Sequence, residues 1–350
     1  MGGVKEAYQQ LLAALCDPRA YPHPAPTVEH LETHISHVFL AGDYAYKLKK
    51  PVDLGFLDFT TLDKRLAACR EEVRLNRRLA PDIYLGVSAV CAVGGRIQVR
   101  ENGCAPGEEA IDYVVRMLRL PQDGMLDALA MHGRLTHAHA LDVARQLARF
   151  HAAAERGPAI ARYGELEAIA APIRQNFAQT ERYLGITIPR ARFERLRDWS
   201  ENFLRAQAAR FAARVAESKI VDGHGDLHLR NMCLVRERVV IFDCIEFNPA
   251  LRACDAIGDI AFLAMDLDHR ALATLGNVFL NEYLERTQDY AGLPLLDFYQ
   301  VYHAYVRGKV NSFLLDGAAS EADKTHAREE AGRYFELAER YLSPRAPGLL

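Results

Sequence analysis

The residue pattern changes once along the chain, near Pro121, and this change limits the possible folds most. Residues 27–118 contain short strand-like runs around one helical stretch, Thr61–Leu79. Beyond Pro121 the sequence is rich in Ala, Leu and Arg at helical spacing, and one strand-like stretch, Ile220–Phe247, interrupts it. The pattern therefore predicts an α+β chain with a sheet-rich front and a helix-rich back.

The length of the chain favours two lobes. Its 350 residues correspond to about two domains, or to one large domain with two lobes. The last strand-like run of the front part ends near Leu118, and the proline at position 121 stops it. We therefore expect a small sheet-rich front lobe at residues 1–118, to which the motifs below assign nucleotide binding, and a larger helical lobe at residues 119–350.

Charge and cysteine usage limit the kinds of partner. The formal net charge of −3 provides no general attraction to nucleic acid or to an anionic membrane. We find no apolar run of the ~18 residues that a membrane helix needs, and no secretory signal at the N-terminus. The seven cysteines are scattered without a C-x-x-C pair, which predicts reduced thiols. We expect a cytoplasmic protein that binds its partners at local sites; its oligomeric state is not predicted.

The strand-like stretch contains side chains that suit a hard metal ion. Asp226 and Asn231 lie in a polar loop, and Asp243 ends the second strand of the hairpin that follows. Carboxylate and amide oxygens are ligands that Mg²⁺ prefers, and substrate phosphates complete its octahedron. The motif therefore predicts an Mg²⁺-nucleotide site at Asn231 and Asp243, with Asp226 free to face an acceptor.

The spacing within this loop strengthens the interpretation. The kinase catalytic loop has the form H-x-D-L-x-x-x-N, and Asp226 precedes Asn231 by the same interval with Leu227 in place. The hairpin then leads directly to Asp243, in the position of the metal-binding Asp of such enzymes. The alternative is that Asp226 and Asn231 only form turns and that Asp243 only ends a strand.

These motifs resemble those of the aminoglycoside phosphotransferase-like kinases, which belong to the protein-kinase-like superfamily. The resemblance rests on His224–Asn231 and on Phe242–Phe247, and it is strongest to an uncharacterised bacterial branch. It extends from Val28 to Leu314 and implies a bilobal kinase fold with ATP in the cleft. Some members of the branch carry a further P-loop domain, and this sequence contains no G-x-x-x-x-G-K-S/T motif.

The resemblance implies that the front lobe supplies a lysine for the α- and β-phosphates and a glutamate that orients it. Lys47 stands in an Ala-x-Lys context like that of the kinase strand, and we prefer it over Lys49. The alternative is that these lysines form a solvated basic edge of the sheet. Glu71 lies on a charged helical face, whereas Glu72 shares its face with apolar residues. An acid there needs a buried partner, so Glu72 is expected to pair with Lys47.

The remaining nucleotide contacts have weaker signals. No G-x-G-x-x-G precedes Lys47, so Ser36 and adjacent backbone amides are expected to cover the phosphates, as polar loops do in the family that the chain resembles. The front sheet ends at Met117 and Leu118, whose backbone is expected to lie against adenine. An ordinary strand end is the alternative.

Three further residues are expected to support the loop. His151 ends an apolar helical stripe and is interpreted as a hydrogen-bonded core residue. The family resemblance implies that Asp259 buttresses the catalytic loop. His224 is expected to brace the same loop by hydrogen bonding.

Together these residues predict an ATP-dependent kinase that phosphorylates a hydroxyl of a small molecule. Asp226 would accept or orient that hydroxyl, while Asn231 and Asp243 would hold Mg²⁺. Lys47 with Glu72 would fix the α- and β-phosphates. Two other functions stay open, a nucleotide-binding regulatory module with little catalysis and the transfer of AMP to a protein.

The sequence does not identify the acceptor. The helical lobe is expected to form the acceptor pocket, within residues 161–218 and 270–315. Acidic residues of this lobe can attract a cationic acceptor, but basic residues are interleaved with them, which favours solvated helix faces. These acids are Asp266, Asp268, Glu282, Glu285 and Asp289. Likeness to antibiotic kinases does not imply antibiotic resistance.

Overall fold

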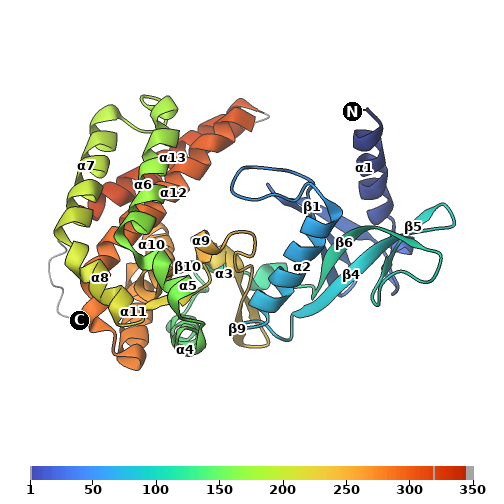
Figure 1. Ribbon diagram of the computed structural model, residues 1–350, viewed down its shortest axis with the longest axis horizontal. Coiled ribbons are helices and arrows are strands. Elements are labelled where there is room, and N and C mark those ends of the chain that lie inside the picture. The colour runs from blue at the N-terminus through green and yellow to red at the C-terminus, as the bar shows by residue number, and fades with distance from the viewer. Residues whose placement is uncertain (1, 318–319, 344–350) are drawn as a thin grey trace. The chain divides into compact units, whose positions relative to one another are not determined.

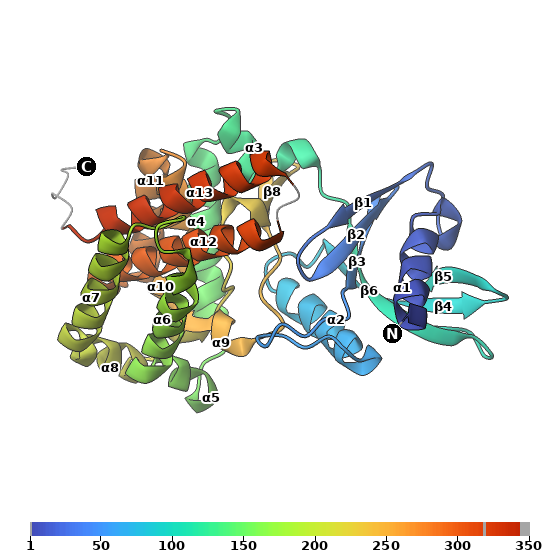
Figure 2. The same cartoon turned by 90° about the horizontal axis from the view of Figure 1, so that it is seen from above.

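The computed structural model describes residues 2–317 and 320–343, without the side chains of residues 2–5. The chain divides into two compact units. The sheet unit contains residues 1–125 and 233–249, and the helical unit contains residues 126–232 and 250–350. Figures 1 and 2 show the elements of both units, and the predicted α+β class with a sheet-rich front and a helix-rich back is confirmed.

A six-stranded antiparallel sheet organises the sheet unit. Its strand order is β1-β2-β3-β6-β4-β5, and a separate hairpin pairs β8 with β9. The strands are β1 (Val28–Glu32), β2 (Ser36–Ala41), β3 (Tyr44–Lys49), β4 (Tyr84–Val93), β5 (Arg96–Arg100), β6 (Glu109–Leu118), β8 (Met232–Val235) and β9 (Arg238–Ile241). β2 and β3 form a hairpin, and Gly42 takes a left-handed φ of 57° in its tight turn.

Two helices of this unit pack on opposite faces of the sheet. They are α1 (Gly2–Leu15) and α2 (Leu62–Asn76), which begins after the capping residue Thr61. Tyr46 and Leu48 of β3 belong to the apolar cluster that includes α1, whereas Ala45 belongs to the cluster that includes α2. Because side chains alternate along a strand, Lys47 and Lys49 project from the α2 face. Both lysines therefore lie on the face of the sheet that α2 covers.

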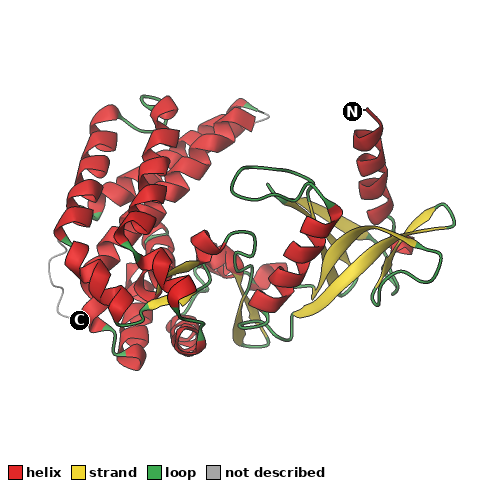
Figure 3. Cartoon of the chain, in the orientation of Figure 1, coloured by secondary structure: helices red, strands yellow, loops and turns green. Residues whose placement is uncertain are grey.

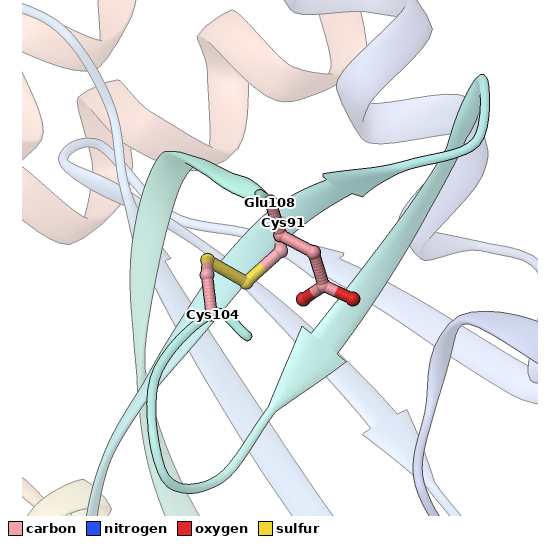
Figure 4. Close-up of side chains that lie close together, drawn as sticks. All are labelled: Cys91, Cys104 and Glu108. Atoms are coloured by element: carbon pink, nitrogen blue, oxygen red, sulfur yellow. A yellow bond between two sulfur atoms is a disulfide. The ribbon is translucent and has the colours of Figure 1, made fainter. Parts of the chain in front are cut away.

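A disulfide joins β4 to the loop after β5. Cys91 and Cys104 are bonded, with their Cα atoms 5.8 Å apart, and Glu108 lies beside them (Figure 4). The expectation that every cysteine is a reduced thiol is wrong for this pair. The two cysteines are 13 positions apart, and β5, which returns antiparallel along β4, brings the loop that carries Cys104 back to Cys91.

The helical unit is built around the buried helix α10 (Ala256–His269), whose first twelve residues are all buried. Helices α11 (Ala273–Thr287) and α12 (Leu296–Gly317) pack on it, and Figure 3 shows how helices dominate this unit. Its other helices are α3 (Leu126–Met131), α4 (His137–Ala153), α5 (Pro158–Ala161), α6 (Leu166–Thr180), α7 (Arg190–Ala206), α8 (Ala208–Ala216) and α13 (Glu321–Arg340). A short helix, α9 (Pro249–Arg252), joins the units along the chain.

The only two strands that the helical unit contains among its described residues are β7 (Ile220–Asp222) and β10 (Ala253–Asp255), which pair with each other. The predicted catalytic loop follows β7 directly and ends in a short 3₁₀ turn at Leu229–Asn231. Within the described residues, no helix is long and apolar enough to cross a membrane.

Candidate active site

Lys47 of β3 is held between two carboxylates in the sheet unit. Its Nζ atom lies 3.0 Å from Oε1 of Glu72 and 2.5 Å from Oδ1 of Asp243. The Glu72 side chain is fully buried, whereas 40% of the Asp243 side chain is exposed. Burial by itself disfavours the charged ammonium, but Asp243 and Glu72 outweigh this effect and raise the pKa of Lys47 well above its usual value. The structure thus brings together three of the residues that the sequence singles out.

Lys49 is part of the same ionic cluster, and its environment differs from a solvated edge. Its side chain is fully buried, its Nζ atom lies 2.6 Å from Oε2 of Glu72, and it also binds the buried Glu246. The alternative of a solvated basic edge is therefore wrong for this lysine. Sequence reasoning missed the role of Glu246, although its position three residues after Asp243 in the quoted motif was a usable signal.

The two glutamates of the cluster titrate in opposite directions. Burial would raise the pKa of Glu72, but the adjacent Lys47 and Lys49 lower it to about 2. Burial raises the pKa of Glu246 despite its contact with Lys49, and the negative charge of Glu72 adds to the rise. Glu72 is thus the firmly ionised member, because two ammonium groups share it.

Hydrogen bonds from α2 and β4 fix the segment that carries Asp243. The backbone N–H of Asp243 donates to the hydroxyl of the buried Tyr84 at 3.1 Å, and the N–H of Cys244 donates to Oδ1 of Asn76 at 2.8 Å. Asp243 itself has a left-handed φ of 63°. This backbone turns the carboxylate toward Lys47, and Tyr84 and Asn76 are supporting residues that the sequence did not reveal.

The predicted phosphate and adenine residues lie in the same unit. Ser36 begins β2 directly opposite Lys49, is fully buried, and its Oγ atom has no hydrogen-bond partner within the described part of the chain. Met117 pairs with strands on both sides, so its backbone lies inside the sheet. Leu118 lines a cavity of about 890 Å³ together with Asp43 and with residues 79–83, 119–123, 235–236 and 238–240. Of the two predicted adenine contacts, only Leu118 therefore borders open space there.

The catalytic loop of the helical unit brings Asp226 and Asn231 together. Nδ2 of Asn231 donates to Oδ2 of Asp226 at 2.8 Å and to its backbone oxygen at 3.0 Å. Nε2 of His228 lies 3.3 Å from the same Oδ2 atom. Burial would raise the pKa of Asp226, but His228 foremost, with His224 and Arg307, lowers it below the usual range. The loop thus presents an ionised carboxylate whose orientation is fixed.

A buried network of hydrogen bonds supports the backbone of this loop. Asp259 accepts hydrogen bonds from the backbone N–H groups of His224 and Gly225, at 2.8 and 2.9 Å. Its Oδ2 atom also lies 3.0 Å from Nε2 of His151, whose Nδ1 atom meets the hydroxyl of Tyr283 at 2.8 Å. The interpretation of His151 as a hydrogen-bonded core residue is confirmed, and Asp259 contacts the loop as expected.

Gly225 is required by the close approach of another backbone to the loop. Its φ is 83°, and a Cβ atom at this position would lie 2.5 Å from the backbone oxygen of Leu251. A side chain cannot fit without moving that backbone. The glycine before Asp226 therefore lets the loop lie directly against the backbone of α9.

The predicted site residues thus form two groups, one in each unit. A buried lysine and glutamate beside an aspartate that follows β9, together with an Asp-to-Asn loop after a short strand in a helical unit, are the arrangement expected of a protein-kinase-like phosphotransferase. A model of the Phosphotransferase enzyme family, APH, matches residues 54–296, and the chain belongs to this family. The resemblance inferred from the motifs is therefore confirmed.

The sequence matches to relatives cover most of the chain. Uncharacterised proteins of Mycobacterium tuberculosis and Mycobacterium bovis are 36% identical to it over 324 residues. The match covers 91% of the chain and 61% of each relative, so the chain spans about three fifths of the length of these curated relatives.

Similar solved structures confirm the predicted bilobal kinase-like fold. A choline kinase from Cryptosporidium parvum is 11% identical, with a TM-score of 0.53 and 95% of both chains covered. A choline/ethanolamine kinase family protein from Mesorhizobium loti is 15% identical, with a TM-score of 0.50, 96% of this chain and 97% of that chain covered. The GDP complex of aminoglycoside 2′-phosphotransferase-IIIa is 14% identical, with a TM-score of 0.50 and coverages of 90% and 94%.

Proposed function

We propose that the chain is an ATP-dependent kinase that transfers the γ-phosphoryl group to a hydroxyl of a small molecule. Membership of the phosphotransferase family supports the reaction class. The observation that carries the proposal is the Lys47 ammonium held between Glu72 and Asp243, because this arrangement supplies a phosphate-binding cation beside a metal-binding carboxylate.

In the sheet unit, Lys47 would bind the α- and β-phosphates and Glu72 would orient it. The Lys47 ammonium contacts Asp243 in the structure, so on nucleotide binding it would exchange this carboxylate for phosphate oxygens. Ser36 and the backbone at Leu118 complete the proposed nucleotide contacts, whereas the backbone of Met117 is paired on both sides within the sheet. The 890 Å³ cavity beside Leu118 offers space next to that backbone.

The donor set fits Mg²⁺, which binds oxygen ligands and usually retains phosphate oxygens of the nucleotide. Asp243 offers a partly exposed carboxylate, and Asn231 uses its Nδ2 atom toward Asp226, which leaves its amide oxygen for a metal. When bound, the metal would neutralise charge on the phosphates. Asn231 would thus join the metal to the loop that carries Asp226.

Asp226 would orient the acceptor hydroxyl. Its lowered pKa keeps it ionised, so it accepts a hydrogen bond from the hydroxyl before transfer. The acceptor oxygen then bonds to the γ-phosphorus, the bond to the bridging oxygen breaks, and ADP leaves. The hydroxyl proton passes to Asp226 and from there to solvent.

The test is ADP release that depends on an added acceptor. We expect release by the wild type with Mg²⁺-ATP and at least one member of a panel of sugars, amino alcohols and hydroxy acids, and a loss of at least about a thousandfold in Asp226→Asn. Intact mass of the products distinguishes a transferred phosphate from a transferred adenylyl group. Equal ADP release by Asp226→Asn and the wild type would refute the proposal. A cytoplasmic location, where ATP is supplied, belongs to the same proposal.

A further inference from the structure

Arg307 of α12 is a partly buried cation without a carboxylate partner. Its guanidinium lies over the ring of Tyr334, 5.6 Å from the centroid. Within the described residues, no Asp or Glu oxygen comes within ion-pair distance of it. Arginines with limited access to water are normally paired, because an unpaired buried charge is costly. This guanidinium is therefore available to a ligand.

The face of α12 that carries Arg307 lies beside the catalytic loop. His303, one turn before Arg307, stacks on Phe262 with 4.4 Å between ring centroids. Phe262 packs against His228 at 5.5 Å, and Nε2 of His228 lies 3.3 Å from Asp226. This continuous series of contacts connects α12 to the carboxylate that is proposed to face the acceptor.

The electrostatic effect of Arg307 agrees with this placement. Asp266 of α10 accepts a hydrogen bond from the backbone N–H of Leu229, within the catalytic loop, at 2.9 Å. Burial would lower the pKa of Arg307, but Tyr334 foremost, with smaller contributions from Asp226 and Asp266, raises it above its usual value. The guanidinium thus acts at the same loop that carries Asp226.

The acidic residues that the sequence offered for a cationic acceptor have other roles. Asp289, together with Asp255, binds the buried Arg214, and Glu285 is exposed on α11. The other three are also engaged: Asp266 with Arg270, Asp268 with the hydroxyl of Tyr341, and Glu282 with Arg145 and Arg286. Four of the five carboxylates are thus engaged by this protein's own side chains, and the fifth, Glu285, lies at the surface of α11.

A second cation of α12 also lacks a carboxylate partner among the described residues. Nζ of Lys309 donates to amide oxygens of Asn176 and Gln179 in α6, at 2.6 and 2.9 Å. Burial lowers its pKa to about 8. The helix therefore presents two positive charges without carboxylate partners in the part of the lobe where the acceptor pocket is expected.

We propose that the acceptor alcohol carries an oxyanionic group, a carboxylate or a phosphate, which Arg307 binds while Asp226 faces its hydroxyl. The inference rests on the proposed kinase function. The planar guanidinium fork matches the two oxygens of a carboxylate or phosphate. A cationic acceptor would instead be placed beside an unpaired arginine, which disfavours it by like-charge repulsion. The proposed acceptor is thus anionic and differs in charge from choline and the aminoglycosides, after which the similar structures are named.

The test uses four acceptors that share a diol or its equivalent and differ in charge. They are glycerate, glycerol 3-phosphate, glycerol and 3-amino-1,2-propanediol. With Mg²⁺-ATP and the full chain, we expect kcat/KM for one of the two anions to exceed that for glycerol by at least about tenfold. The amine should be the poorest acceptor. The two anionic arms distinguish carboxylate from phosphate recognition, and preference for the amine would overturn the inference.

Substitution of Arg307 tests whether its guanidinium binds the anionic group of the acceptor. In Arg307→Gln the ratio of kcat/KM between the better anion and glycerol should fall by about tenfold or more, and Arg307→Lys should restore part of the ratio. The control is Arg205→Gln, because Arg205 is exposed on α7 and bonds only locally to Asn202 and Glu201. A ratio that is unchanged in Arg307→Gln, or an equal loss for all four acceptors with a raised KM for Mg²⁺-ATP, would assign Arg307 to another role and overturn the inference.

Failure of the kinase proposal can be distinguished experimentally from failure of the inference about the anionic acceptor. If Asp226→Asn releases ADP as fast as the wild type, the catalytic assignment fails whatever the acceptor preference. If no panel member is phosphorylated, thermal unfolding with Mg²⁺ and AMP-PNP decides the inference, with malonate and inorganic phosphate as probes. A Tm increase by either probe that is lost in Arg307→Gln supports the anion site, and equal shifts or no shift in both proteins overturn it.

Discussion

In the sheet unit, two lysines and three carboxylates bind one another, whereas in the helical unit the loop carboxylate is held by an amide and an imidazole. The carboxylate of Glu72 forms ion pairs with the Nζ atoms of Lys47 and Lys49 at 3.0 and 2.6 Å, so the stability of each charge there depends on its neighbours. Oδ2 of Asp226 instead accepts a hydrogen bond from Nδ2 of Asn231 at 2.8 Å, and the hydrogen bond from the N–H of Gly225 to Asp259 fixes the backbone before it. The first arrangement is adapted to exchange of ionic partners, and the second to a fixed orientation.

The largest effect is expected from removing the exchangeable carboxylate. Asp243→Ala deletes both the proposed metal ligand and the partner of Lys47, so Mg²⁺-ATP-dependent turnover should fall to the background of the assay. Steady-state ADP release measures this loss, and circular dichroism checks that the fold is retained. Turnover within about tenfold of the wild type would remove Asp243 from the proposed metal site.

The fixed carboxylate should behave differently. Asp226→Ala removes the group that orients the acceptor and leaves the nucleotide contacts of the sheet unit intact, so kcat should fall about a thousandfold or more while the Kd for Mg²⁺-ATP stays within about threefold. Calorimetric titration measures the Kd for Mg²⁺-ATP, and single-turnover kinetics measure the rate of the chemical step. Loss of nucleotide binding in Asp226→Ala would show that the two groups of residues do not act separately.

Stability should reveal the interdependence within the sheet unit. Lys49→Met leaves the buried Glu246 without its cation, so the free energy of unfolding should fall by about 3–5 kcal/mol, and Glu246→Gln in the same chain should recover part of it. Lys64→Met is the control, since Lys64 pairs with Asp58 at the surface and should change stability by less than about 1 kcal/mol. Urea unfolding measures all three. Similar losses at positions 49 and 64 would contradict the buried cluster.

The smallest effect is a pH dependence of the same cluster. The pKa of Glu72 in the folded chain is about 2, below its unfolded value near 4.3, so its contribution is complete above about pH 4.3 and is lost as the pH falls toward 2. The raised pKa of Glu246 contributes the opposite slope. Over this window the wild type should lose up to about 3 kcal/mol more than Glu72→Gln. Equal slopes in chemical unfolding would contradict the assignment.

Local spacing allowed part of this molecule to be predicted. The loop from Asp226 to Asn231 and the β8 and β9 hairpin before Asp243 depend on residues that are close in sequence, and both were found. Glu72 could be preferred over Glu71 because a buried acid on an apolar face needs a partner. In each of these cases the pattern itself carried the physical constraint.

The remaining features depend on contacts that no spacing encodes. Glu246 meets Lys49 across 197 positions, and the pairing of Cys91 with Cys104 depends on the strand register of β4 and β5. Arg307 lies beside the catalytic loop because α12 packs on α10, and its sequence context resembles any charged helical position. Such residues become visible only when packing shows which charges lack a partner.

The sharing of Glu72 also limits how this part of the chain can vary in evolution. Because one carboxylate serves both lysines, a substitution at position 47 changes the charge balance at position 49, and the reverse holds as well. Their effects on stability should therefore be non-additive, since residues in one ionic network couple. Lineages that lose one lysine are expected to change Glu72 or Glu246 in compensation, so these four positions should evolve as a unit.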